Sequence, residues 1–378
     1  MTMVHSEIKQ EILKLISFLQ NRDYSIRKLS KILNSNGIFK VQTWISLKEK
    51  VRSLPDNNEF LTKIHTALNE EYSKNLKFGK KAIVFFDISS IDENELDEFS
   101  KKLEEVIRDN SSTEYSQFFP NLIPEDILED QSTQLFCVLH EQQSENIDKY
   151  WVCGKKSFKH RKEFQLGDAP DEVQEYFSGF DVGLYDEVVA IRQDFKQLVS
   201  YFTIDKLNGL LTFYSDATAI TSQSDMDYLS DTLFSYLIKI YPPLASTACK
   251  KNIGRAIRNL YDEDMGRVTS FSHYTDSGSV KHEKLDRKNS QEDLRFEQYH
   301  VGGMQSIEFR TEFHAIEKKW RSVSQTELFE PTVSLSYKSF LDSTNHRVSA
   351  CFMAEIDDCA CQEDLDSLTE KILMFSNN

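Results

Sequence analysis

The ten residues from position 77 to 86 constrain the fold more than any other part of the chain. Before them the apolar residues recur at helical spacing, whereas residues 82–86 form a continuous apolar run. Such a short run is typical of a strand buried on both faces, because a half-exposed strand alternates apolar and polar residues. The sequence therefore predicts that a helical unit ends near Lys77 and that a sheet begins directly after it.

Residues 1–77 are predicted to form an all-helical module. In the first helix Ile8, Ile12, Leu15 and Leu19 make one apolar stripe. A second helix is expected to start at the cap Ser25 and to end at Gly37, and a third to end before Pro55. A fourth helix follows up to position 77. Short helices joined by short turns indicate a compact bundle or a helix-turn-helix-like module.

Residues 78–245 are predicted to form an α+β domain. Strands are expected at 82–86, 135–139 and 150–153, with an acidic helix from about 92 to 108. Asn208-Gly209 separates two strand-like segments, 198–204 and 210–214, and Asn-Gly is the preferred pair for a type I′ hairpin turn. A helix should follow the hairpin and end at Pro242.

Residues 246–378 are predicted to form a strand-rich α+β domain. Positions 332–337 and 348–356 alternate between apolar and polar residues, which indicates antiparallel strands with one face on a core. A final helix is expected over the last residues. The fold class is therefore α+β, with a helical N-terminal module and a mostly antiparallel sheet body that carries packed helices.

The charge of the chain is unevenly distributed. The 378 residues have a net charge of −16, but residues 1–77 carry 13 Lys and Arg against 8 Asp and Glu, a local excess of +5. The remaining residues carry −21. A basic head on an acidic body is typical of a nucleic-acid surface beside a protein-binding one, or of two surfaces that attract each other in an oligomer.

The first basic cluster lies on the second and third helices of the N-terminal module. Helix-turn-helix proteins place such a helix in the major groove while neighbouring cations bind phosphates. The loop at residues 34–38 is longer than the tight turn of that motif, and surface cations also serve solubility alone. The candidate nucleic-acid-binding residues here are Arg27, Lys28, Lys31, Lys48 and Arg52.

A second cluster falls within eight residues that contain no Asp or Glu, and Tyr150, Trp151 and Phe158 are interleaved with it or precede it. Basic residues that follow phosphates, with aromatic rings available for base stacking, are typical of single-strand binding. The alternative is a hairpin tip kept soluble by its cations. The candidate residues are Lys155, Lys156, Lys159, Arg161 and Lys162. A third basic group comprises Lys250, Lys251, Arg255 and Arg258.

Two metal-dependent alternatives use other residues. Asp186, Asp194 and Lys196 loosely match the pattern of Mg²⁺-dependent nucleases, in which carboxylates bind the ion and a lysine activates water. The pattern is permissive and acidic proteins often contain it. A zinc site from Cys137, His140, Cys153 and His160 is disfavoured, because Cys137 and His140 fall on a probable strand, where positions three apart face opposite sides. No P-loop, dinucleotide-binding or nucleophile-elbow motif occurs.

We therefore expect a non-catalytic subunit of a multiprotein assembly, without a cofactor, that contacts DNA or RNA through its basic clusters and protein partners or a second copy through its acidic body. The alternatives are the Mg²⁺-dependent nuclease and an interaction scaffold that binds no nucleic acid. No apolar run approaches the ~20 residues of a membrane span, and six scattered cysteines without a signal-peptide pattern favour the cytoplasm. A role in a bacterial accessory system such as antiviral defence is a hypothesis about the biological context, and no residue in the sequence supports it.

Overall fold

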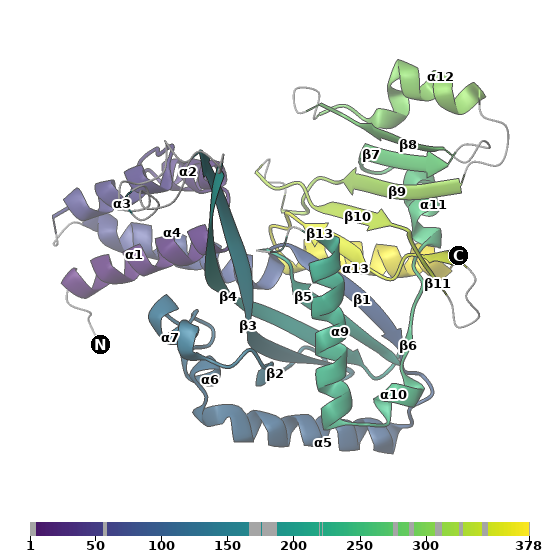
Figure 1. Ribbon diagram of the computed structural model, residues 1–378, viewed down its shortest axis with the longest axis horizontal. Coiled ribbons are helices and arrows are strands. Elements are labelled where there is room, and N and C mark those ends of the chain that lie inside the picture. The colour runs from purple at the N-terminus through teal and green to yellow at the C-terminus, as the bar shows by residue number, and fades with distance from the viewer. Residues whose placement is uncertain are drawn as a thin grey trace.

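A computed structural model describes residues 5–55, 59–165, 175, 187–218, 220, 222–274, 279–286, 291–306, 312–324, 328–341 and 347–377. N-terminal helices precede a large antiparallel sheet with further helices packed on it (Figure 1). This arrangement confirms the α+β fold class.

The N-terminal helices begin and end close to the predicted residues. The Ser25 side chain accepts a hydrogen bond from the backbone N–H of Lys28, as expected for a cap, and Gly37 has a φ of +70° just after the helix ends. The apolar stripes of all four helices enter one buried core. The helices are α1 (His5–Asn21), α2 (Ile26–Ser35), α3 (Trp44–Ser53) and α4 (Glu59–Phe78).

One sheet runs through the remainder of the chain in the strand order β2-β3-β4-β5-β1-β13-β10-β9-β7-β8. Strands from both sides of the boundary predicted at residue 245 therefore belong to the same sheet. Its strands are β1 (Lys81–Asp87), β2 (Phe136–Gln142), β3 (Ile147–Gln165), β4 (Glu187–Asp205), β5 (Leu210–Asp216), β7 (Arg267–Tyr274), β8 (Val280–Lys284), β9 (Glu312–Lys319), β10 (Thr332–Ser336) and β13 (Ala354–Asp357), and the short β6 (Cys249–Lys250) pairs with β1.

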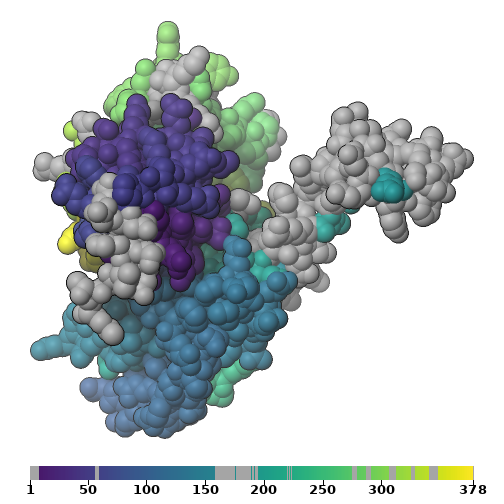
Figure 2. Space-filling view, turned by 90° about the vertical axis from the view of Figure 1, so that its left-hand side faces the viewer, coloured from purple at the N-terminus to yellow at the C-terminus, as the bar shows by residue number. Residues whose placement is uncertain are grey.

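Helices cover both faces of the N-terminal half of the sheet. On the face shown in Figure 2, the N-terminal helices lie between the blue segment that follows β1 and the green C-terminal strands. The helices are α5 (Glu93–Asp109), α6 (Glu114–Phe118), α7 (Glu125–Asp130), α9 (Gln223–Ile240), α10 (Leu244–Thr247), α11 (Arg255–Asp262), α12 (Gln298–Ser306) and α13 (Gln362–Asn377), with 3-10 turns η1 (Asn110–Ser112) and η5 (Leu294–Phe296).

Strand β1 is buried on both faces, as its sequence predicts. Ala82, Val84 and Phe86 pack into a core with α5, α9 and α10. Ile83 and Phe85, which point the other way, pack into the core formed with the N-terminal helices and α13. The strand pairs with β5 on one side and β13 on the other. Its apolar run therefore forms the centre of the molecule.

The hairpin around Asn208-Gly209 forms, but its predicted turn type is wrong. Asp205 pairs with Leu210, so the loop has four residues, and only Gly209 adopts a positive φ, of +56°. A type I′ turn needs positive φ at both central residues. Instead the Asp205 side chain accepts a hydrogen bond from the backbone N–H of Asn208 at 3.0 Å. This side-chain contact replaces the tighter turn.

The alternation over residues 348–356 is divided between two strands. Strand β12 (Arg347–Ala350) pairs with β11 (Lys338–Leu341) in a separate small sheet, whereas β13 joins the main sheet. A period of two shows which residues share a face but contains no information about where a strand is interrupted. No helix in the described ranges has the length and apolar character that crossing a membrane requires.

Candidate functional site

Strands β3 and β4 form a two-stranded ribbon that extends beyond the sheet. Their pairing continues without a break from Ile147 opposite Asp205 to Gln165 opposite Glu187. Strand β2 accompanies β3 only as far as Cys153, and β5 accompanies β4 only over residues 201–205. Figure 1 shows the two strands leaving the sheet together. The outer part, residues 154–165 and 187–198, carries seven Lys and Arg against three Asp and Glu.

The second predicted basic cluster lies on this ribbon. Lys155 is buried, donates to the Glu129 carbonyl at 2.8 Å and lies 4.4 Å from the centre of the Phe195 ring. Lys156 forms an ion pair with Asp225 at 2.6 Å. This hydrogen bond from Lys156 is the main cause that lowers the pKa of Asp225. These two lysines therefore anchor the base of the ribbon.

The other three members of the cluster lie further out on β3. Lys159, Arg161 and Lys162 are in register with positions 193, 191 and 190 of β4. Their side chains lie outside the described part of the structure. The backbone therefore places these residues on the ribbon, well beyond the last residue that β2 pairs with.

The first predicted cluster divides in a similar way. Lys28 forms an ion pair with Asp358 and lies 4.9 Å from the centre of the Phe329 ring, so it connects α2 to the C-terminal part of the chain. Lys48 donates to the Gln20 side chain at 3.0 Å. The remaining members have exposed side chains: they are Arg27, Lys31 and Arg52.

A buried ion pair connects the N-terminal helices to the sheet. Arg22, 3% exposed, donates to both carboxylate oxygens of Asp216 at 2.8 and 3.3 Å and to the Asn75 side chain at 2.6 Å. Burial alone would raise the pKa of Asp216, but Arg22 and Lys81 outweigh it and hold that pKa well below its usual range. Burial lowers the pKa of Lys81 to about 8. The ion pair fixes the end of α1 against β5.

The candidate nuclease residues are placed only in part. Asp186 lies outside the described residues, and Asp194 is on β4 opposite Phe158, with an undescribed side chain. The Nζ atom of Lys196 lies 3.5 Å from the Asp23 carboxylate of the N-terminal unit. The nuclease therefore stays a prediction.

The cysteines considered for zinc do not converge. Cys137 and Cys153 pack into cores on opposite faces of the sheet, so they cannot bind the same ion. His140 makes a 2.9 Å contact with Asp148 through Nε2. Among the residues with described side chains, no group of three or more His, Cys, Asp or Glu side chains is arranged to bind a metal.

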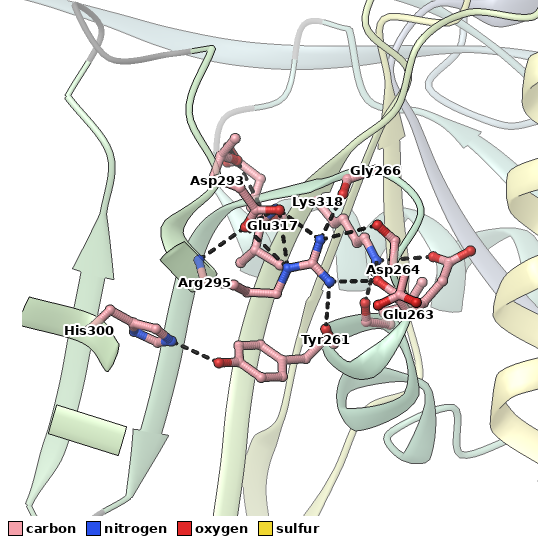
Figure 3. Close-up of polar contacts among 12 residues, drawn as sticks. Tyr261, Glu263, Asp264, Gly266, Asp293, Arg295, His300, Glu317 and Lys318 are labelled. Carbon is pink, nitrogen blue, oxygen red and sulfur yellow. Dashed lines mark hydrogen bonds and ion pairs between the residues drawn. The ribbon is translucent and has the colours of Figure 1, made fainter. Parts of the chain in front are cut away.

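The C-terminal end of α11 is held by the partly buried guanidinium group of Arg295 (Figure 3). Arg295 donates to the carbonyls of Tyr261 at 3.1 Å, Glu263 at 2.6 Å and Gly266 at 2.8 Å. It also contacts the Asp293 carboxylate at 2.6 Å. The last carbonyls of a helix lack partners within the helix, and cations there also interact favourably with the helix dipole. Arg295 therefore supplies hydrogen-bond donors to the carbonyls at the C-terminal end of α11.

A second cation, which is fully buried, supports the same helix end. Lys318 on β9 is fully buried and donates to the Leu260 carbonyl at 2.6 Å and the Glu263 carbonyl at 2.7 Å. The Glu263 carboxylate contacts Lys318 at 3.0 Å and also pairs with Lys371 of α13. Burial lowers the pKa of Lys318. Strand β9, α11 and α13 are thus connected at one point.

Beside this cluster, His300 lies between a phenol and a carboxylate. Its Nε2 is 2.8 Å from the Tyr261 hydroxyl and its Nδ1 is 2.6 Å from Glu283 (Figure 3 draws the Tyr261 contact). An ionised carboxylate can only accept, so Nδ1 of His300 donates to Glu283. Burial raises the pKa of Tyr261. The order resembles a nucleophile–histidine–carboxylate triad, but His300 is only 1% exposed and the Tyr261 ring packs against Phe271 and Phe313, which favours a structural role.

These groups were missed by reasoning from the sequence. Arg22 and Asp216 are 194 positions apart, and Lys318 and Leu260 are 58 apart. No spacing rule connects residues that meet only through tertiary packing. No model of a known protein family matches the chain, and a search of curated proteins found no relative.

Proposed function

We propose that this chain is a non-catalytic subunit of a larger assembly that contacts nucleic acid through the β3–β4 ribbon. The observation that carries the proposal is the uninterrupted pairing of β3 with β4 beyond the last residues that β2 and β5 pair with, on a segment that has seven Lys and Arg against three Asp and Glu. Three of these cations, Lys155, Lys156 and Lys196, also contact the body of the protein, and the others lie further out or on the other strand. The chain as a whole has a net charge of −16. Protein partners would bind its acidic body.

The physical case rests on shape and charge together. The major groove of duplex DNA admits a two-stranded β-ribbon, and Lys and Arg that neutralise phosphates supply most of the non-specific affinity. An isolated two-stranded ribbon is only marginally stable, so the part of the ribbon beyond the sheet contributes little to the stability of the fold. Because the body as a whole is acidic, most of its surface should repel a nucleic-acid backbone, which favours contact at the ribbon.

The N-terminal helices would supply a second contact. Arg27, Lys31 and Arg52 are exposed and available, whereas Lys28 and Lys155 are held by contacts within the chain. We therefore give Lys28 and Lys155 a structural role. Arg27, Lys31 and Arg52 would bind nucleic acid in addition to the ribbon.

The experiment measures binding of fluorescently labelled duplex DNA and single-stranded RNA by anisotropy between about 50 and 200 mM salt. The ribbon variant replaces Lys159, Arg161 and Lys162 by Glu. A matched control makes the same charge change at exposed lysines of three helices, and a third variant reverses the charge of the helical residues. The control residues are Lys14, Lys101 and Lys239.

We expect the ribbon variant to bind at least about 10-fold more weakly, with a salt slope smaller by about 0.9 for each phosphate that it no longer neutralises. The control should keep most of its affinity. Absence of binding at the lowest salt, or an equal loss in the control, would contradict the proposal. A loss confined to the variant at Arg27, Lys31 and Arg52 would move the interface to the N-terminal helices and overturn the assignment to the ribbon.

A further inference from the structure

A separate cavity of about 490 Å³ lies beside the N-terminal end of α11. Its volume is within the range of about 300–1,000 Å³ that small-molecule sites occupy. Side chains from α11, from the ends of β7 and β9, and from the residue after β10 line it. They include Arg255, Arg258, Tyr274, Phe313, His314 and Tyr337.

The cavity has an excess of positive charge. Arg255 is exposed and makes no hydrogen bond or ion pair with any residue that the structure describes. Arg258 has a 3.6 Å ion pair with Asp262 in which both side chains are more than half exposed, so this pair is weak. The N-terminal end of α11 adds partial positive charge, and Glu312 is the one carboxylate among the lining residues that are described.

Aromatic rings also line the cavity. Tyr274 and His314 are in edge-to-face contact with their ring centres 5.0 Å apart, and the Arg258 guanidinium lies 5.3 Å from the centre of the Phe313 ring. Tyr337 packs on Gly254, where an added Cβ atom would lie 2.3 Å from the Tyr337 hydroxyl. The rings and the two guanidinium groups therefore share one cavity.

One polar atom of the lining lacks a partner. Nδ1 of His314 is buried and makes no hydrogen bond within the part of the chain that is described. Buried polar atoms are nearly always hydrogen-bonded in native proteins, and a turn of the His314 ring toward the cavity would let this nitrogen bond to a ligand. Burial also lowers the pKa of His314. Its imidazole is therefore neutral, with one nitrogen that donates and one that accepts a hydrogen bond, which suits an uncharged ring of a ligand.

The helix that carries the arginines is fixed before any ligand binds. Arg295 and Lys318 hold its C-terminal carbonyls (Figure 3), and Asn259 donates to the Phe375 carbonyl of α13 at 2.8 Å. A site on a rigid element loses less entropy on binding than a site on a loop.

We propose that this cavity binds a nucleotide. Its phosphate would contact Arg255 and Arg258 at the start of α11, and its base would lie against the rings of Tyr274, His314 and Tyr337. Arginine binds phosphate through paired, charge-assisted hydrogen bonds, and aromatic stacking contributes binding energy for any base. The site is separate from the ribbon, so it does not depend on the proposed function.

Isothermal titration calorimetry of the full chain with AMP, adenosine and inorganic phosphate tests the proposal. We expect saturable AMP binding and at least about 10-fold weaker binding of both adenosine and phosphate, because each probe lacks one half of the contacts. Arg255→Gln with Arg258→Gln should weaken AMP binding by a similar factor. Arg108→Gln with Arg321→Gln, at two exposed arginines elsewhere, is the matched control and should leave it unchanged.

Three results would overturn the proposal. They are no saturable AMP binding up to about 1 mM, phosphate binding as tight as AMP binding, or unchanged AMP affinity in the variant at Arg255 and Arg258. Both arginines are exposed, so this variant should fold normally, and circular dichroism checks that it does. The ribbon variant should bind AMP normally, so failure of either proposal can be told from failure of the other.

Discussion

Replacing Arg22 by Met should destabilise the protein strongly, because it leaves the Asp216 carboxylate buried without its main counter-charge. Asp216 is fully buried and loses two hydrogen bonds, at 2.8 and 3.3 Å. It keeps the backbone N–H of Val199 at 2.9 Å and the Thr218 hydroxyl at 2.7 Å. Removing one partner of a buried ion pair typically costs about 3–5 kcal/mol. Lys81 remains nearby, so we expect a value near about 3 kcal/mol.

Urea unfolding followed by tryptophan fluorescence measures this change, since Trp44 lies in the helical module and Trp151 in the sheet. The pKa of Asp216 lies well below its usual range, so the ion pair stabilises the fold above the unfolded-state pKa of about 3.9. That contribution is lost as the pH falls through the lower, folded-state pKa. The difference in unfolding free energy between wild type and Arg22→Met should therefore be largest at neutral pH and should decrease in acid.

Arg27→Met is the matched control, because Arg27 is exposed on the next helix and should change stability by less than about 0.5 kcal/mol. The double variant Arg22→Met with Asp216→Asn should lose less than the sum of the single losses, since neither charge is then left alone. A loss below about 1 kcal/mol in Arg22→Met, or strict additivity in the double variant, would refute the reasoning.

Three further perturbations have sharp expectations. Gly209→Ala should destabilise the protein by about 1–3 kcal/mol, because the φ of +56° disfavours a side chain and the new Cβ would lie 2.7 Å from Ser89. Thermal unfolding measures this change, and Gly302→Ala, where the added Cβ meets open space, is the control that should not destabilise. Lys318→Met should cost about 2–4 kcal/mol by the same measurement, because two carbonyls and a carboxylate at the end of α11 lose a buried donor. A thiol reagent should modify the exposed Cys249 fastest in the native protein and the partly exposed Cys361 more slowly, because burial raises the pKa of Cys361 to about 11. The four buried cysteines should react only after unfolding, and Cys249→Ser should abolish the fast phase.

Several features of the fold could be predicted because their causes are local. Ser25 begins α2 and Asp92 begins α5 because short side chains accept hydrogen bonds from the backbone N–H groups just after them. Positive φ at Gly37 is likewise set by one residue. The continuous apolar run of β1 predicted burial on both faces, since neither face has a residue that prefers water.

Other features depend on residues far apart in the sequence. Asn208-Gly209 indicated a hairpin correctly, but the longer loop that forms lies against Ser89, which is far away in the sequence. From the sequence alone, Lys28 and Lys155 are equally good candidates for binding a ligand. In the structure Lys28 pairs with Asp358, and Lys155 donates to the Glu129 carbonyl. Composition gives the charge of a residue but not the partner that folding brings to it.

The sequence by itself determined the helical start, the α+β class, the strand at residues 82–86 and the uneven charge, because each follows from short-range periodicity or from counting. Only the tertiary structure decided that one sheet continues past residue 245, that β3 and β4 leave it as a ribbon, and that Arg22, Arg295 and Lys318 find partners within the fold. The physical reason is that hydrogen bonds and ion pairs between distant segments depend on three-dimensional proximity, which no local pattern of side chains specifies.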